Sequence, residues 1–227
     1  LNANVNYDRT FRGHHVTALA GFEQATYRLD YMGAGINKYD SDILDEFFAG
    51  SADKDWYSIK GYARETARRS WFGRLGYDWK SRYLVQLIGR FDGSENFPKN
   101  KRWGFFPGVS AGWRISEEPF LKQNAAWLTN LKLRASYGEQ GNDQIDSFQY
   151  MTTYGYTSLS SYKQRFDDKD VNFIIPGKVP NKNVTWEVAK TWNIGVDGSI
   201  KNGLFAWELE FFKTERSNIL CTRNASI

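Results

Sequence analysis

The sequence has very few of the residues from which disulfides, metal sites and catalytic centres are built. Among 227 residues there is one Cys, and the two His are adjacent at positions 14 and 15. Cys221 alone cannot form an internal disulfide, and His14 and His15 have no Cys or acidic residue at a ligand-like spacing. No G-x-S-x-G nucleophile elbow is present. The sequence therefore predicts neither an enzyme nor a metal site.

Signals for cofactors and nucleic acid are also weak. Gly33-Ala34-Gly35 lacks the third glycine of a dinucleotide fingerprint, so no cofactor is expected. Asp40, Asp42, Asp45, Glu46, Asp53 and Asp55 make the segment 28–63 acidic, but they lack the Asp-x-Asp-x-Asp-Gly pattern, so calcium there stays an open alternative. The net charge of +4 is scattered among acids rather than gathered in a stripe, and no nucleic-acid partner is expected.

Long apolar runs are absent too. No stretch of about 20 apolar residues occurs, so no transmembrane helix is expected. A transmembrane strand needs no such run, because its lumen-facing residues are polar. The mean hydropathy of −0.61 is therefore compatible with a membrane protein.

What the sequence does contain is period-two alternation together with many aromatic residues. Aromatics make up 17% of the chain and Trp occurs 9 times. From Tyr83 to Asp92, and again in the segments 192–200 and 205–212, apolar or small residues alternate with mostly polar ones. One apolar face and one charged, Gly-rich face are what a strand needs between lipid and a water-filled lumen.

This alternation predicts an all-β fold, an antiparallel up-and-down meander of about eight strands. The expected strands are 1–11, 15–27, 64–79, 82–95, 103–114, 130–139, 186–200 and 204–217. Compact connections alternate with longer ones, as in outer-membrane barrels, where periplasmic turns are short and outer loops long. In the compact fifth connection, Ser116 as N-cap and Pro119 near N1 predict a short helix over 120–128.

Side-chain directions follow from the same alternation. Phe91, Trp113, Tyr137, Trp192 and Trp207 are expected to face outward, and Arg90, Asp92, Arg134 and Asp197 inward. Most Trp residues, Trp186 among them, are expected in two aromatic girdles near strand ends. A β-sandwich core would explain the aromatics and the alternation equally well, but not the unequal loop lengths.

Four motifs occur in order along the chain. They are RFDGSENFPKNKRWGFFPGVSAGWRISEEPFLK at 90–122, LKLRASYGEQGND at 131–143, WEVAKTWNIGVD at 186–197 and KTERSNIL at 213–220, followed by RNASI. Together they resemble the SusC/RagA family of TonB-dependent outer-membrane transporters. Gly108 departs from the family pattern, where Ser is commoner. The loops 28–63 and 144–185 match least.

The resemblance implies that residues 1–227 are part of a transmembrane β-barrel of about 22 strands, a size known for plugged outer-membrane transporters. We expect the plug domain and the remaining strands to lie outside this chain. The resemblance further implies TonB-energised import of an oligosaccharide or peptide at the cell outer membrane, with a SusD-like surface lipoprotein as partner and outer-membrane lipid around the barrel. Contact with the TonB complex is expected through the missing N-terminal part.

The expected substrate-binding residues lie in outer loops and upper strand ends. They are Trp56, Tyr57, Asp92, Glu95, Asn142 and Asp143. Aromatic faces stack on sugar rings, and carboxylates or amides bond hydroxyl groups or a peptide backbone. The alternative function is that of a soluble β-rich module that binds carbohydrate through exposed aromatics.

Overall fold

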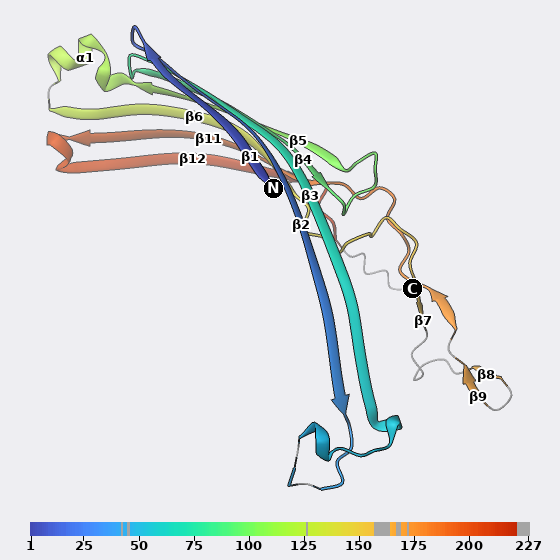
Figure 1. The fold of residues 1–227 in the computed structure, drawn as a ribbon. Helices are drawn as coiled ribbons and strands as arrows, with labels where there is room; N and C mark the ends of the chain where they lie inside the picture. The colour runs from blue at the N-terminus through green and yellow to red at the C-terminus, as the bar shows by residue number, and fades with distance from the viewer. Residues whose placement is uncertain are drawn as a thin grey trace. The chain divides into compact units, whose positions relative to one another are not determined.

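A computed structural model describes residues 1–41, 43–44, 46–125, 127–156, 164–166, 169–171 and 173–221. The chain divides into two compact units, residues 1–24 with 68–227, and residues 25–67. One eight-stranded sheet in the order β1-β2-β3-β4-β5-β6-β11-β12 dominates the fold (Figure 1). Its strands are β1 (Asn2–Phe11), β2 (His14–Ile36), β3 (Tyr57–Trp79), β4 (Tyr83–Ser94), β5 (Trp103–Arg114), β6 (Leu128–Asn142), β11 (Glu187–Ile200) and β12 (Phe205–Ser217).

Neighbouring strands follow one another along the chain, and each pair with a described register is antiparallel. The sheet is open, with β1 and β12 at its edges. The excursion between β6 and β11 carries four short strands in two pairs, β7 (Tyr154–Tyr156) with β10 (Ile174–Pro176) and β8 (Gln164–Phe166) with β9 (Lys169–Val171). The predicted meander of eight strands is therefore confirmed. The described strands do not form the two-layer sandwich that was the alternative.

Two of the predicted strand boundaries are wrong. β2 continues to Ile36 and β3 begins at Tyr57, so residues 28–36 and 57–63 are strand rather than loop. Every side chain in these extensions is exposed or half-buried, as in β1 and β12. Gly33, Gly35 and Gly61 interrupt the alternation of larger apolar and polar residues there, so the period-two signal fades.

The remaining connections contain short helices. They are η1 (Phe47–Ala49), η2 (Lys54–Trp56), η3 (Ile115–Glu117), α1 (Pro119–Asn124) and η4 (Lys201–Gly203). Pro119 opens α1 as predicted, but Glu118 is its N-cap, whereas Ser116 lies in η3. Within the described residues, no helix has the length and apolar character to cross a membrane.

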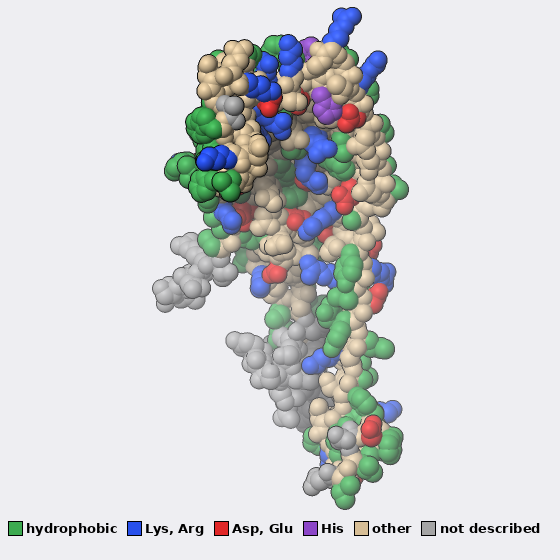
Figure 2. All heavy atoms as spheres, turned by 90° about the vertical axis from the view of Figure 1, so that its left-hand side faces the viewer, with side chains coloured by type: hydrophobic (Ala, Val, Ile, Leu, Met, Phe, Trp, Pro, Cys, Tyr) green, Lys and Arg blue, Asp and Glu red, His purple; other side chains and the backbone are tan. Residues whose placement is uncertain are grey.

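The register divides the side chains between two faces. In antiparallel pairs, directly opposite residues point to the same side of the sheet. Phe91 pairs with Phe105, Tyr137 with Trp192, and Trp207 with Gly198, which places the predicted outward set on one apolar face. Arg90, Asp92, Arg134 and Asp197 share the opposite face, as predicted. Figure 2, which looks onto the end with the short turns, shows charged side chains in the hollowed middle and hydrophobic ones toward the borders.

The buried core lies at the end with the long loops. Phe97, Phe106, Val184 and Trp186 form it, and Ile145, Tyr150 and Val188 pack against it. Trp186 is 8% exposed and donates from Nε1 to the Arg102 carbonyl at 3.1 Å. Its place in a lipid-facing girdle is therefore a wrong prediction, because Trp186 precedes β11 and joins two loops instead.

Candidate functional site

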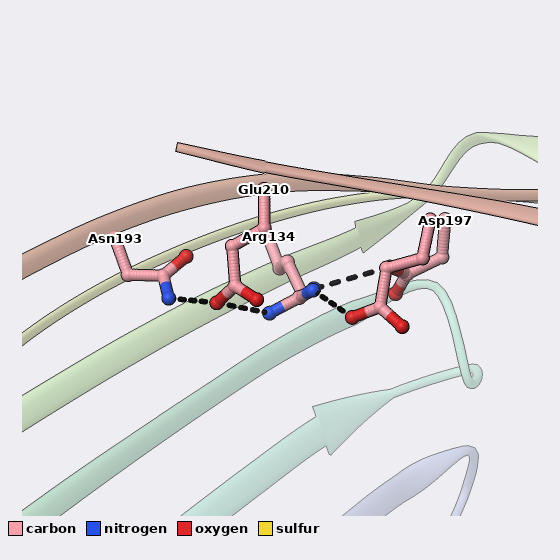
Figure 3. Close-up of polar contacts among 5 residues, drawn as sticks. Arg134, Asn193, Asp197 and Glu210 are labelled. Atoms are coloured by element: carbon pink, nitrogen blue, oxygen red, sulfur yellow. Dashed lines mark hydrogen bonds and ion pairs between the residues drawn. The ribbon is translucent and has the colours of Figure 1, made fainter. Parts of the chain in front are cut away.

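The polar face carries a charge network that joins β6, β11 and β12. Arg134 donates from Nε to Asp197 Oδ1 at 3.1 Å and from Nη1 to Glu210 Oε1 at 3.3 Å, and it also pairs with Glu208 (Figure 3). Asn193 donates to the same Glu210 carboxylate. The Arg134 guanidinium thus pairs with three acids and ties β6 to β11 and β12 through side chains on this face.

A glycine makes room for this network. Gly195 lies directly opposite Arg134, and a Cβ added there would stand 2.8 Å from the guanidinium. The side chain of Arg134 therefore crosses the bare backbone of Gly195 to reach its acids on β11 and β12. Gly195 thus leaves space for a side chain of the same sheet.

At the loop end of the same face lies a polar hollow of about 380 Å³. Its lining includes Arg68, Asn142, Asp143, Glu187 and Arg216. Arg68 Nη2 stands 2.8 Å from Asp143 Oδ1, and Arg216 Nη1 stands 3.6 Å from Glu187 Oε1. Two cations and two anions line the hollow, so it presents both hydrogen-bond donors and acceptors.

Two of the predicted site residues meet in this hollow and have different surroundings. Asn142 is exposed at the end of β6 and donates to Glu187 Oε2 at 3.3 Å. Asp143 is buried, and its carbonyl accepts from Asn96 Nδ2 at 3.0 Å. Asn142 is therefore accessible to a ligand, whereas Asp143 holds the loop after β4 against the end of β6.

The other two predicted residues of this unit have local roles. Asp92 Oδ1 accepts from Arg90 Nη2 at 2.9 Å, two residues away on the same strand. Glu95 is half-buried in the loop after β4, and its Oε2 has no hydrogen-bond partner among the described residues. Neither lines the hollow.

Trp56 and Tyr57 lie in the unit formed by residues 25–67. Trp56 ends η2, and the Lys38 ammonium lies 5.5 Å from the centroid of its ring. Tyr57 is the first residue of β3 rather than part of a loop. Both side chains are exposed, so each presents a free aromatic face.

The arginines and glutamate of the hollow were missed by the sequence reasoning. Arg68, Glu187 and Arg216 come from β3, β11 and β12, and only the sheet register brings their strand ends together. The alternation of faces could have found them. Glu187 is ten residues from the predicted inward residue Asp197, so both face the same side. Arg68 and Arg216 are likewise an even number of residues from positions that pair with Asp92 and Asp197.

Metal binding has little support in the described part of the chain. There, no group of three or more His, Cys, Asp or Glu residues could hold an ion. Asp42 and Asp45, which belong to the acidic segment considered for calcium, lie outside the described residues. His15 Nε2 stands 3.0 Å from Asp8 Oδ1, and His14 Nδ1 stands 2.8 Å from the Tyr77 hydroxyl.

At the turn end, a buried carboxylate ties three elements together. Glu118 Oε1 accepts from the Tyr83 hydroxyl at 2.7 Å and from Trp113 Nε1 at 3.0 Å, and Oε2 lies 3.4 Å from Arg82 Nη1. The hydrogen bond from Tyr83, that from Trp113 and the charge of Arg82 lower the pKa of Glu118. The carboxylate therefore anchors the segment before α1 to the ends of β4 and β5.

A family model described as "TonB dependent receptor-like, beta-barrel" matches residues 1–225. The chain belongs to this family. The resemblance to SusC/RagA transporters is confirmed, since SusC of Bacteroides thetaiotaomicron is 37% identical over 161 residues, covering 70% of this chain and 16% of SusC. TonB-dependent receptor P39 of Formosa agariphila is 34% identical over 204 residues, covering 86% of this chain and 18% of that protein.

Solved structures agree on the fold. The RagAB peptide importer in its closed-closed state superimposes with a TM-score of 0.81 and 24% identity, over 95% of this chain and 23% of that one. The open-open state gives a TM-score of 0.79 and 24% identity, over 93% and 22% of the two chains. This chain thus spans roughly a fifth of the length of its relatives, and the family to which it belongs is one of outer-membrane receptors and transporters.

Proposed function

We propose that this chain is part of the barrel of an outer-membrane, TonB-energised importer of an oligosaccharide or peptide. The observation that carries the proposal is the division of one sheet into an exposed apolar face and a charged face. A face that exposes Trp71, Leu87, Trp192, Leu209 and Phe211 needs lipid to cover it. The opposite face, with its arginines and acids, suits the wall of an aqueous path for a polar solute.

The substrate is proposed to bind first at the loop end of the polar face. The hollow there offers the charged groups of Arg68, Glu187 and Arg216 beside the amide of Asn142. Sugar hydroxyls and peptide groups both donate and accept hydrogen bonds, so a hollow that offers both kinds of partner suits either class. In the unit of residues 25–67, Trp56 and Tyr57 are proposed as separate contacts, with exposed rings that can stack on a sugar or a side chain.

The partners follow from the relatives. A SusD-like surface lipoprotein is proposed to contact the loop end, and TonB a part of the protein outside these 227 residues. The solved relative RagAB, a peptide importer, supports this form of assembly. Co-purification of the full-length protein without any lipoprotein would contradict the pairing.

Ligand binding to the full-length protein tests the site. Asn142→Ala and Arg216→Ala each remove a hydrogen-bonding group from the hollow, and a bond to a charged group contributes about 1.5–3 kcal/mol. Titration calorimetry with a panel of oligosaccharides and peptides should show affinity falling about tenfold or more for the bound class. Trp56→Ala and Tyr57→Ala should also weaken binding while the barrel still assembles.

Lys99→Ala is the matched control, because Lys99 is exposed in the loop after β4 and does not line the hollow. Its affinity should equal that of the wild type. Unchanged affinity in all four site variants would remove these residues from the binding site. Binding of no oligosaccharide and no peptide would contradict the proposed substrate classes.

A further inference from the structure

The short turns at one end of the sheet share an unusual choice of residue. The turn between β1 and β2 has Arg12 at φ 47° and Gly13 at φ 82°, and the turn between β3 and β4 has Lys80 at φ 52° and Ser81 at φ 56°. The turn between β11 and β12 begins with Lys201 at φ 46°. Positive φ is costly for residues with a Cβ, and hairpin turns favour Asn, Asp or Gly at these positions. Each tight turn instead places a cation at its first left-handed residue.

Two of these turns lie side by side. The Lys80 backbone N–H donates to the Gly13 carbonyl at 2.6 Å, which joins the two turns. A Cβ added to Gly13 would stand 3.2 Å from Lys80 Cγ, so the Lys80 side chain passes directly over the neighbouring turn. Within the part of the chain that the structure describes, Arg12, Lys80 and Lys201 have no anionic partner, and the Lys80 ammonium lies over a ring. Figure 2 shows several Lys and Arg side chains standing at this rim.

The aromatic ring next to the Lys80 ammonium shows on which face of the sheet this charge lies. The Lys80 ammonium is 5.2 Å from the centroid of Trp79, a half-exposed residue of the apolar face. Trp79 belongs to a row of stacked rings that crosses β1 to β5 at this level. Successive centroid distances are 5.5 Å for Phe11–His14, 6.4 Å for His14–Trp79, 5.6 Å for Trp79–Tyr83 and 6.4 Å for Tyr83–Trp113. The Lys80 ammonium therefore lies next to this row of rings, on the apolar face of the sheet.

Aromatic rings with a polar edge settle at the headgroup level of a bilayer, and lysine reaches past them to the surface. At that level, a cation without an anionic partner in the protein is close to the phosphate groups of phospholipids. We propose that Arg12, Lys80 and Lys201 form a basic rim that binds the headgroups of anionic phospholipid at the turn end of the barrel. This site is separate from the substrate hollow, which lies at the other end of the strands.

The test uses the full-length protein in detergent and measures lipid binding by native mass spectrometry. Phosphatidylglycerol should bind more tightly than phosphatidylcholine of the same chain length. Each cation near an anionic surface strengthens binding about fivefold, so the double variant Arg12→Asn/Lys80→Asn should bind phosphatidylglycerol about 25-fold more weakly. Asn is well tolerated at positive φ, so both turns are expected to form.

Lys201→Asn should weaken the same lipid about fivefold on its own, which gives an independent check from the third turn. Lys99→Asn removes one charge at the loop end and should leave lipid affinity unchanged. Equal affinity of the wild type for the two lipids would overturn the proposal, and would point to a rim that meets an acidic protein or only water. Wild-type affinity in the double variant, or an equal loss in Lys99→Asn, would overturn it as well.

Discussion

The two ends of the eight-stranded sheet are built by different physical means. At the turn end, strands are joined by a few residues and held by backbone hydrogen bonds, stacked surface rings and the Glu118 carboxylate. At the loop end, the long connections bury Phe97, Phe106, Val184 and Trp186 together. Hydrogen bonds and exposed ring contacts therefore hold the first end, whereas a buried apolar core holds the second.

The largest expected effect comes from removing the centre of the loop-end core. Trp186→Ala should destabilise this end by about 3–5 kcal/mol, because a fully packed aromatic leaves a cavity. Hydrogen exchange on the full-length protein should show lost protection in the loop segments 95–102 and 143–151, with β4 and β5 still protected.

Trp192→Ala is the matched control for this experiment. Trp192 is 56% exposed on the apolar face, against 8% for Trp186, so its truncation leaves no internal cavity. It should leave loop protection unchanged. An equal loss of loop protection in Trp186→Ala and Trp192→Ala would show that the buried core does not stabilise the loop end more than the exposed rings do.

A smaller effect is expected where the two ends meet, in the middle of the polar face. Gly195→Ala places a Cβ against the Arg134 guanidinium, which must shift and weaken its contacts with Asp197 and Glu210. We expect a loss of about 1 kcal/mol, since breaking such a network is a recognised source of destabilisation.

Gly138→Ala is the control for this glycine. Gly138 lies on the same face of β6, and an added Cβ would meet nothing within 4 Å. Ala there should be neutral or slightly stabilising, because glycine weakens a strand interior. Thermal unfolding of both full-length variants measures the difference, and equal unfolding temperatures would show that Arg134 adapts without loss.

The smallest expected effect is the pH dependence of the turn end. The pKa of Glu118 is lowered from 4.5 in the folded protein, chiefly by the hydrogen bond from Tyr83. Its contribution to stability is therefore complete above the unfolded value, and it is lost as the pH falls through the lower folded value. Between about pH 6 and pH 3, the unfolding temperature of Glu118→Gln should approach that of the wild type.

Glu117→Gln is the control, because Glu117 is half-buried and pairs at 2.6 Å with the exposed Lys122 at the surface, and surface pairs contribute little. Its unfolding temperature should differ little from the wild type at any pH in this range. A Glu118→Gln curve that stays parallel to the wild type would show that this carboxylate does not anchor the turn.

The sequence predicted the strands well wherever apolar and polar residues alternate. β4 and β5 were placed to within a residue or so, because two faces of different polarity impose alternation over every pair of positions. Residues 28–36 and 57–63 were missed because glycines interrupt the alternation there. The candidate site was predicted only in part. Asn142 was predicted because it lies at the end of a predicted strand. Arg68, Glu187 and Arg216 were not, because they reach the hollow from strands that are far apart in the chain.

By itself the sequence determined the all-β class, the family, the order of the strands and the face on which each side chain lies. These depend on local periodicity and on motifs within single strands. Only the tertiary structure decided that Trp186 is buried among loops, that Arg134 bridges three acids across Gly195, and that the turns at Gly13 and Lys80 lie side by side. These contacts join residues up to 84 positions apart, as for Trp186 and Arg102. The register of the sheet, rather than any pattern along the chain, brings such residues together.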